Sequence, residues 1–401
     1  MATGHPPLFS YDDKGESMVD QQGPAPVAAV IVLAAGAGTR MKSTKSKLLH
    51  TIAGRSLLSY AIDAAAAVTP QQLVVVVGHQ RDQVEAHLAD IAPQVTLAVQ
   101  EVPRGTGDAV RSGMLPIPDV RGEVVVTMGD VPLLAGDTLR ALVEAHRGNA
   151  DAVTVLTTVL DDAGSYGRIL RDEGGEIVRI VEFKDATAEQ AAIREINAGI
   201  YVFDADVLRE GLASLTTDNT QGELLLTDVI AFARSRGGRV HPMVLDDRWQ
   251  AEGVNDRTQL AALGRIKNER ICDAFMLAGV SIVDPGTTWI EDGVDIEADA
   301  TLLPGTQLQG ATTIHAGATI GPDTTLADAE VGVDAVVIRT QGQLTTIGDR
   351  TVVGPYVHLR PGTQIGADAK VGSFVELRAA KVADGETVPA LTSRDEHLHA
   401  D

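Results

Sequence analysis

The chain has 401 residues, 44% of them hydrophobic and 22% charged, a composition that excludes disorder over its whole length and predicts two or three domains. Its formal net charge of −22 disfavours nucleic acid and anionic membranes as partners, so a phosphate site has to be built locally. The single cysteine, Cys272, excludes an internal disulfide and a multi-cysteine metal site, which favours a reducing compartment, the cytoplasm.

Residues 1–26 have no basic start, apolar core or cleavage pattern, and they predict a flexible tail rather than a signal peptide. No later run reaches the roughly 18 apolar residues that a membrane span needs. We therefore expect no association with a membrane.

Residues 27–256 alternate short β-rich runs with helical patterns. The runs VAAVIVLAAG and QLVVVVGH have the composition of buried strands, and helical stretches follow them at residues 57–67 and near Val84. This alternation predicts a Rossmann-like α/β domain with a mainly parallel sheet. A third run, EVVVTMGDVP, ends in Gly129 and Asp130, at the carboxyl edge where such sheets bind ligands.

Residues 257–278 contain no proline and have apolar side chains at close to helical spacing, which predicts a linker helix. After it, aliphatic residues recur every six positions, with glycine often nearby. The twelve positions in phase are Ile296, Leu302, Leu308, Ile314, Ile320, Leu326, Ile347, Val353, Leu359, Ile365, Val371 and Leu377.

A six-residue period predicts a short left-handed parallel β-helix, which we place at residues 279–390, with a tail at 391–401. The step from Leu326 to Ile347 is 21 residues rather than 18. We interpret the difference as about three extra residues in a loop.

The first strand runs into a glycine-rich turn and a basic segment, GAGTRMKSTKSK. Glycines allow backbone N–H groups to approach a polyphosphate, and basic side chains neutralise its charge. By itself this pattern does not distinguish a phosphate cradle from a structural turn. The candidate nucleotide-binding residues here are Leu33, Ala34, Ala35, Gly36 and Gly38, with Arg40 and Lys47 as candidate catalytic residues.

The motif LAAGAGTRM, followed six residues later by Lys47, resembles the signature of nucleotidyltransferases that make sugar nucleotides. The continuation KLLHTIAGRSLL resembles one branch, the bifunctional bacterial N-acetylglucosamine-1-phosphate uridyltransferase/glucosamine-1-phosphate acetyltransferase family. The resemblance covers residues 30–388. It implies a sugar-nucleotide pyrophosphorylase that converts UTP and N-acetylglucosamine 1-phosphate to UDP-N-acetylglucosamine and pyrophosphate by direct displacement, with Mg²⁺.

The resemblance also implies roles for residues further along the chain. Asp130 and Asn255 in EGVNDR would hold the metal, since Mg²⁺ prefers oxygen ligands. The base would be recognised by Gln100, Gly105 and Thr106, and the sugar by Gly167, Glu182 and Asn197. Each residue also has a purely structural interpretation, for example a turn cap at Asp130, an N-cap at Asn255-Asp256 or a surface ion pair of Glu182 with Lys184.

Two positions near the nucleotide depart from this family. Ser46 stands where the family has proline before its lysine, which predicts a looser loop around Lys47. Asp108 stands where the family has histidine in GTGHA, and it adds a negative charge near the nucleotide.

The acetyltransferase half departs further. Arg360-Pro361-Gly362 and VGSFVELR resemble its sugar-phosphate clamp, with Arg378 in place of a lysine, but VPALTS puts Ala390 and Ser393 where the family has its general-base histidine and a tyrosine. Alanine cannot accept a proton. The hexapeptide pattern also stops before Asp401, and His397 and His399 are out of phase. We therefore expect the acetyltransferase activity to be lost.

Several alternatives remain open from the sequence. The resemblance implies a homotrimer through the β-helix, although a monomer or dimer is compatible with a shortened one. The sugar could be another hexosamine phosphate and the nucleotide dTTP. The chain could be a noncatalytic sugar-nucleotide sensor, or an acetyltransferase that uses an unrelated base. Retention of Lys47, Asp130 and Asn255 favours the enzyme over the sensor.

Overall fold

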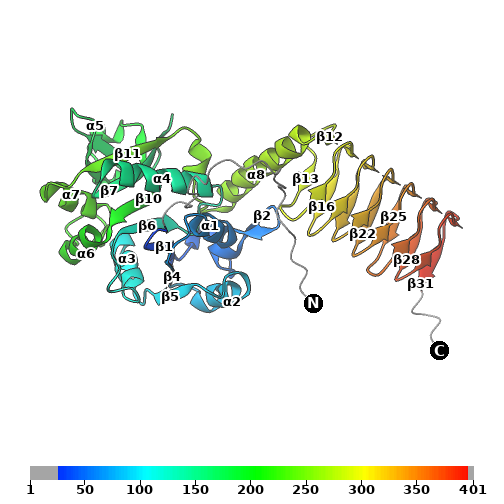
Figure 1. Cartoon of the computed structure of the whole chain (residues 1–401), viewed down its shortest axis with the longest axis horizontal. Coiled ribbons are helices and arrows are strands. Elements are labelled where there is room, and N and C mark those ends of the chain that lie inside the picture. The colour runs from blue at the N-terminus through cyan, green and yellow to red at the C-terminus, as the bar shows by residue number, and fades with distance from the viewer. Residues whose placement is uncertain (1–25, 396–401) are drawn as a thin grey trace, which may run out of the picture.

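The structure is a computed structural model, and it describes residues 26–395. The expected N-terminal tail and the histidines at 397 and 399 lie outside these residues, apart from Pro26. Figure 1 shows an elongated molecule in which an α/β domain at one end is joined by the helix α8 to a stack of β coils at the other.

The α/β domain is built on one nine-stranded sheet. Its main path runs in the order β11-β7-β10-β6-β1-β4-β5, and β8 and β9 branch from β10. Strands β1, β4, β5 and β6 are parallel, as are β7 and β11, while β10 is antiparallel to its neighbours. The strands are β1 Ala29–Ala34, β4 Gln72–Val77, β5 Thr96–Val99, β6 Glu123–Met128, β7 Val153–Val159, β8 Arg168–Arg171, β9 Ile177–Val181, β10 Glu195–Asp204 and β11 Val240–Leu245; β2 Thr51–Ile52 and β3 Arg55–Ser56 form a separate hairpin.

Helices cover both faces of this sheet. Because successive side chains of a strand point to opposite faces, Ile31 of β1 belongs to one core cluster and Val32 to the other. The cluster around Ile31 contains residues of α3, α6 and α7, and the cluster around Val32 contains residues of α1, α2 and α4. The helices are α1 Leu57–Ala66, α2 Arg81–Ile91, α3 Thr106–Met114, α4 Gly136–Asn149, α5 Ala188–Ala191, α6 Ala205–Ser214 and α7 Asp228–Ser235, with 3-10 turns η1 Thr39–Met41, η2 Lys47–Leu49, η3 Phe183–Asp185 and η4 Arg248–Ala251.

The connecting helix α8, Arg257–Leu277, is bonded to the first coils of the β-helix. The Asp256 side chain caps its start by accepting a hydrogen bond from the Gln259 backbone N–H at 2.9 Å. Asn268 lies on its buried face, donates to the Thr288 carbonyl at 2.8 Å and accepts from the Ile290 N–H at 2.9 Å. These bonds anchor α8 to the edge strand of the β-helix.

The C-terminal part is a parallel β-helix with three faces. Each face is one sheet of very short strands that pair with the strand one coil away. The three sheets are β12 Ser281–Ile282, β15 Thr301–Leu302, β18 Thr319–Ile320, β21 Val336–Val337, β24 Val352–Val353, β27 Lys370–Val371 and β30 Thr387–Val388; β13 Trp289–Ile290, β16 Gln307–Gln309, β19 Thr325–Ala327, β22 Thr340–Gln343, β25 Val357–Leu359, β28 Glu376–Arg378 and β31 Ser393–Asp395; and β14 Asp295–Ile296, β17 Thr313–Ile314, β20 Glu330–Val331, β23 Thr346–Ile347, β26 Gln364–Ile365 and β29 Lys381–Val382.

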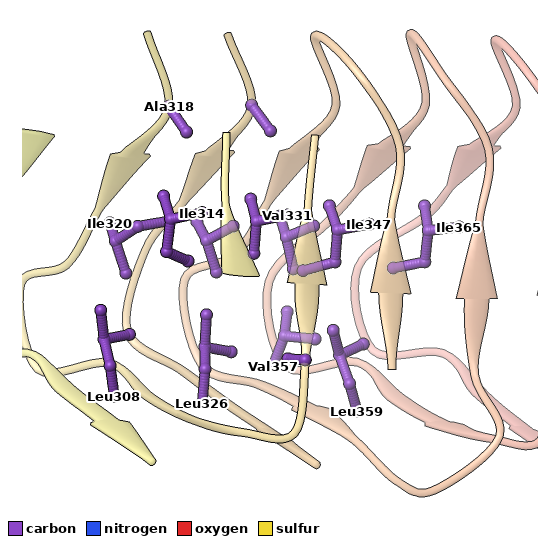
Figure 2. Packing of buried hydrophobic residues seen from close by; sticks show 14 of the residues in the cluster. Leu308, Ile314, Ala318, Ile320, Leu326, Val331, Ile347, Val357, Leu359 and Ile365 are labelled. Atoms are coloured by element: carbon purple, nitrogen blue, oxygen red, sulfur yellow. The ribbon is translucent and has the colours of Figure 1, made fainter. Parts of the chain in front are cut away.

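All twelve aliphatic positions predicted from the hexapeptide period are buried in one cluster. Figure 2 shows Leu308, Leu326 and Leu359 along one side of this interior, with Ile314 and Ile347 on another. The coils therefore stack side chains of one kind above one another, which accounts for the strict period.

The step from Leu326 to Ile347 does not contain the predicted loop of extra residues. It contains four strand-to-strand steps of five, six, five and five residues, through the further inward positions Val331, Val337 and Gly342. Four regular steps of six would take 24 residues, so this stretch of one coil and one further step is three residues shorter than regular rather than longer. The period was hidden because three of the four steps are one residue short and because Gly342 brings no side chain to its inward position.

The parallel pairing also continues past residue 390, where we placed the end of the β-helix. Strand β31, Ser393–Asp395, pairs with β28. Between residues 26 and 395, no helix is long and apolar enough to span a membrane.

Candidate active site

A pocket of about 330 Å³ opens at the carboxyl ends of β1 and β6, the edge of the sheet at which a ligand was expected. Ten residues that the sequence nominated line it: Leu33, Ala34, Ala35, Gly36, Lys47, Gln100, Gly105, Thr106, Asp130 and Asn255. They come from five separate segments of the chain. The fold thus brings the phosphate, base and metal candidates into one cavity.

The glycine-rich turn places Lys47 beside the end of β1. Gly38 has a positive φ of 58°, which favours glycine. A Cβ added at Gly38 would lie 2.7 Å from Cβ of Lys47, so the close approach of the two segments also requires glycine. Met41, on the same turn, is buried in a hydrophobic cluster and so holds the turn against the domain.

Lys47 and Asp130 form an ion pair in the pocket. Both side chains are largely buried, with 11% and 15% of their surface exposed. Asp130 is held in place by its neighbour, because the Gly129 N–H donates to the Leu33 carbonyl of β1 at 2.9 Å. The pair puts a cation and a carboxylate together at the carboxyl edge of the sheet, where an anionic ligand could replace Asp130 as the partner of the Lys47 ammonium group.

Ser46 is buried and hydrogen bonded, contrary to the looser loop that its identity predicted. Its backbone N–H donates to Oε1 of Gln83 at 2.9 Å. The side-chain nitrogens of Gln83 and Gln80 both donate to the Thr44 carbonyl at 3.0 Å. These glutamines from the start of α2 tie down the segment that precedes Lys47.

Arg40 does not line this pocket. Its side chain is exposed, in contrast to Lys47. It lies close enough to Asp256 to contribute, after hydrogen bonds from Gln259 and Thr258, to the lowered pKa of that carboxyl group. The structure therefore places Arg40 outside the pocket, near the residue that follows Asn255.

Asn255 and Asp130 are adjacent, since the Val254 N–H donates to the Asp130 carbonyl at 2.9 Å. Asp256 caps α8, so the N-cap interpretation of the pair Asn255-Asp256 holds for its second residue and leaves the Asn255 side chain free of that role. Among residues 26–395, the Asn255 side chain has no hydrogen-bond partner, and it faces the same pocket as Asp130. A carboxylate and a free amide oxygen are a donor set that fits Mg²⁺, which keeps several waters and takes phosphate oxygens. No group of three or more His, Cys, Asp or Glu able to hold a metal occurs within the same described range.

The candidate base-binding residues, Gln100 and the start of α3, form one end of the pocket. Gly105 has a φ of 111°, and a Cβ there would lie 2.4 Å from the Leu224 carbonyl oxygen. Thr106 accepts a hydrogen bond from the Leu226 N–H at 3.1 Å. The segment at residues 224–226 thus packs directly against the turn at Gly105 and fixes the backbone of that turn.

The three sugar candidates gather beside the pocket rather than in its lining. A Cβ at Gly167 would lie 3.7 Å from both Oε1 of Glu182 and Cβ of Asn197. The Asn197 amide is engaged by the fold, because its nitrogen donates to the Tyr201 hydroxyl at 2.7 Å and its oxygen accepts from the Gly199 N–H at 3.1 Å. Gly199 approaches Met128, which lines the pocket.

Glu182 has an unusual environment for a carboxyl group. Burial raises its pKa, and the hydrogen bond from the Thr227 hydroxyl, at 3.1 Å, opposes this effect. Lys184, the partner predicted for a surface ion pair, instead bonds Gln221 at 3.2 Å. Glu182 is thus a partly desolvated carboxyl group with capacity to accept further hydrogen bonds.

Sequence reasoning did not single out several residues that form the pocket. Leu48, Pro103, Ala109, Met128 and Glu223 also line it. Glu223 lies in the segment NTQGELLLTD, residues 219–228, which also resembles a motif of the family. The apolar residues carry no signal of their own, because they read like any other core position.

The far end of the β-helix has a different character. Ala390 is exposed, and Arg360 and Arg378 are paired with Glu376 and Asp395. One face also has a pocket of about 680 Å³. Tyr356 and Phe374 stack there, with ring centroids 5.1 Å apart, and both are more than half exposed.

Comparison with known proteins assigns both parts of the chain. Residues 29–255 match the nucleotidyl transferase family, and residues 344–379 match the bacterial transferase hexapeptide repeat. The bifunctional protein GlmU of Cutibacterium acnes is 54% identical over 370 residues, covering 90% of this chain and 88% of the relative. The GlmU proteins of Pseudarthrobacter chlorophenolicus and Mycolicibacterium vanbaalenii are each 53% identical, covering 91% of this chain and 75% of each relative.

The chain belongs to the GlmU family. The family resemblance inferred from the loop containing Lys47 is therefore confirmed, as are the Rossmann-like nucleotidyltransferase domain and the left-handed β-helix of hexapeptide repeats. The expected enzyme class, a nucleotidyltransferase, is also confirmed. Ser46, Asp108 and Ala390 are the positions at which this chain departs from the family motifs used in the sequence analysis.

Proposed function

We propose that the chain joins UTP to N-acetylglucosamine 1-phosphate and releases pyrophosphate. The observation that carries the proposal is the Lys47–Asp130 ion pair, which lies in one pocket with Asn255 and Gln100. A cation, two oxygen ligands and a base-reading amide are the groups that transfer of a nucleotidyl group needs.

Lys47 acts in this proposal as an electrostatic catalyst. Its ammonium group is held by Asp130 until a polyphosphate enters, and it then neutralises the charge on the transferred and leaving phosphates. Arg40, at the exposed side of the turn, meets the leaving pyrophosphate. Mg²⁺, held by Asp130 and Asn255, supplies further neutralisation of the phosphates when it is bound. Catalysis rests on positioning and charge, without a covalent enzyme intermediate.

Recognition of the sugar is assigned to Gly167, Glu182 and Asn197. Glu182 accepts hydrogen bonds from sugar hydroxyl groups, and Gly167 leaves room for the ring beside it. The Thr227 hydroxyl, which donates to Glu182, follows the segment at residues 224–226 that packs on the glycine turn at the base end. The segment at residues 224–227 thereby contacts both the residues assigned to the base and a residue assigned to the sugar.

We further propose that the acetyltransferase activity of bifunctional relatives is lost. Ala390 has no group to accept a proton from an attacking amine, and Ser393 cannot supply the ring and phenol of a tyrosine. Arg378 is paired with Asp395, so that cation is already neutralised.

The β-helix is then retained for assembly, as a homotrimer. The exposed face with Tyr356 and Phe374 also carries Leu391, which is 82% exposed, and Arg339, whose guanidinium lies 6.0 Å from the Tyr356 ring. Exposed apolar side chains in a continuous column mark a contact surface. Light scattering would report the mass, and a monomer at micromolar concentration would contradict the assembly.

The experiment that tests the main proposal follows pyrophosphate release from UTP, Mg²⁺ and N-acetylglucosamine 1-phosphate by the full-length chain. Other hexose and hexosamine 1-phosphates, and dTTP, are offered in parallel. We expect the N-acetylglucosamine and uridine pair to react fastest. Release of pyrophosphate from no sugar phosphate would overturn the proposed function, and a faster reaction with another pair would change its substrate.

A further inference from the structure

Gln100 is a buried side chain whose amide is oriented by two acceptors. Its nitrogen donates to the Gly105 carbonyl oxygen and to Oδ2 of Asp108, each at 3.1 Å. An amide nitrogen has two hydrogens, so both are used. The residue is 7% exposed, and its side-chain oxygen has no partner within residues 26–395. The oxygen is therefore the atom of this amide that remains for a ligand in the pocket.

Asp108 is the side chain that, together with the Gly105 carbonyl, orients that amide. It is 4% exposed and accepts from Gln100 through one oxygen and from Arg104 through the other, at 3.0 Å. A carboxylate only accepts hydrogen bonds, so it holds the nitrogen of Gln100 and excludes its oxygen. The family motif has histidine at this position. A neutral imidazole has one donor nitrogen and one acceptor nitrogen, so it does not by itself fix the orientation of the Gln100 amide.

We infer that Asp108 is a positioning residue for base selection, which holds Gln100 so that its oxygen accepts a hydrogen bond from the N3–H of uracil. The inference rests on the proposed function, because it requires that the base of the nucleotide lies against Gln100. It makes the negative charge at position 108 a device for selecting the base, rather than a source of repulsion.

The chemistry of the bases gives the expected selectivity. Once the ribose and phosphates fix the ring, uracil and thymine both place an N3–H donor where cytosine places a lone pair. An acceptor at Gln100 therefore favours UTP and dTTP over CTP, and does not distinguish the first two. Replacing one paired hydrogen bond by two facing acceptors disfavours the wrong base by about 10- to 100-fold.

Asp108→Asn reverses this arrangement with little change in shape. Arg104 keeps the remaining oxygen at position 108, so the new amide nitrogen faces the nitrogen of Gln100. Two donors then face each other unless the Gln100 amide turns over, which would present its nitrogen to the base. The Gly105 carbonyl opposes the turn, and it remains the only orienting acceptor in Asp108→Ala.

The test is calorimetric binding of UTP and of CTP, each with Mg²⁺, to the full-length chain. We expect the ratio of the two affinities to fall in the order wild type, Asp108→Ala, Asp108→Asn, by about tenfold or more overall. Arg104→Ala removes the other partner of the carboxylate and is expected to leave the ratio within about threefold. Thermal melting checks that each variant is folded. If Asp108→Asn does not fold, the comparison of wild type with Asp108→Ala provides the test.

The possible outcomes distinguish failure of the proposed function from failure of the role of Asp108 alone. Wild type that binds neither nucleotide would remove both the proposed function and this inference. Wild type that prefers UTP, with the same ratio in both Asp108 variants, would overturn the role of Asp108 alone. A fall in Arg104→Ala as large as in Asp108→Asn would also overturn it, because loss of the ion pair, and not amide orientation, would then set the preference.

Discussion

The pocket of the α/β domain and the far end of the β-helix differ in how their charged groups are arranged. In the pocket, Lys47 and Asp130 meet beside an unpaired amide, so that charges of both signs face one cavity. At the far end of the β-helix, Arg360 and Arg378 are already paired with acidic neighbours, and an exposed alanine stands at position 390. The buried aliphatic positions that build the repeats and the surface groups that a reaction would need are therefore set independently of one another.

The largest expected difference between the two regions is in acetyl transfer. We expect the chain, given glucosamine 1-phosphate and acetyl-CoA, to release thiol no faster than a blank, because a general base contributes about 10²- to 10⁴-fold and Ala390 supplies none. The Pseudarthrobacter chlorophenolicus relative serves as a positive control in the same assay. Thiol release at a comparable rate would mean that another residue acts as the base. Both regions of the molecule would then be catalytic.

The second prediction removes the cation of the pocket. Lys47→Ala is expected to lower kcat/KM for pyrophosphate release about 10²- to 10³-fold, the usual cost of losing one preorganised charge in an enclosed site. Lys45→Ala, an exposed lysine on the same loop, is the matched control and should change the rate less than about threefold. Equal effects of the two changes would show that the loop acts by net charge rather than through Lys47.

How far the sequence predicted these regions depends on whether a residue's role is local. The hexapeptide period revealed the β-helix because each coil repeats the same inward contact. It failed only between Leu326 and Ile347, where some steps have five residues and Gly342 brings no side chain. The residues of the glycine-rich turn, Asp130 and Asn255 were found through family motifs. Gln83 was not, because it comes from another helix and its bond to Ser46 depends on tertiary structure.

The third prediction concerns Glu182 and has two opposed effects. Burial raises its pKa in the folded state, so the associated stability is fully present below the unfolded-state pKa, near 4.3, and is lost as pH rises through the folded-state value. Glu182→Gln is never charged, and it should raise Tm by a few degrees at pH 7.5 and hardly at pH 4.

In the enzyme assay the same variant should raise KM for the sugar phosphate about tenfold, because a charged acceptor is replaced by a neutral one. Glu189→Gln, an exposed neighbour, should change neither Tm nor KM. A lower Tm in Glu182→Gln at pH 7.5 would contradict the unfavourable desolvation of this carboxyl group.

The smallest expected effect concerns the contact between Gln83 and Ser46, next to Lys47 in the chain. Gln83→Ala leaves the buried N–H of Ser46 without an acceptor and frees the segment before Lys47, so kcat/KM should fall about fivefold, the equivalent of one hydrogen bond of about 1 kcal/mol. Proline has no N–H to satisfy, and the Ser46 φ of −53° lies within its range. Ser46→Pro should therefore restore the rate in the Gln83→Ala background.

Gln80→Ala removes only one of the two bonds to the Thr44 carbonyl and should have the weaker effect. The double variant is the decisive measurement, because a merely destabilising loss of Gln83 would not be reversed by changing Ser46. If Ser46→Pro lowered the rate further in that background, Gln83 would act on Lys47 by some route other than the N–H of Ser46. Restored activity would show that the hydrogen bond from Ser46 to Gln83 and a proline at position 46 have the same effect. Each holds Lys47 in place at the edge of the sheet.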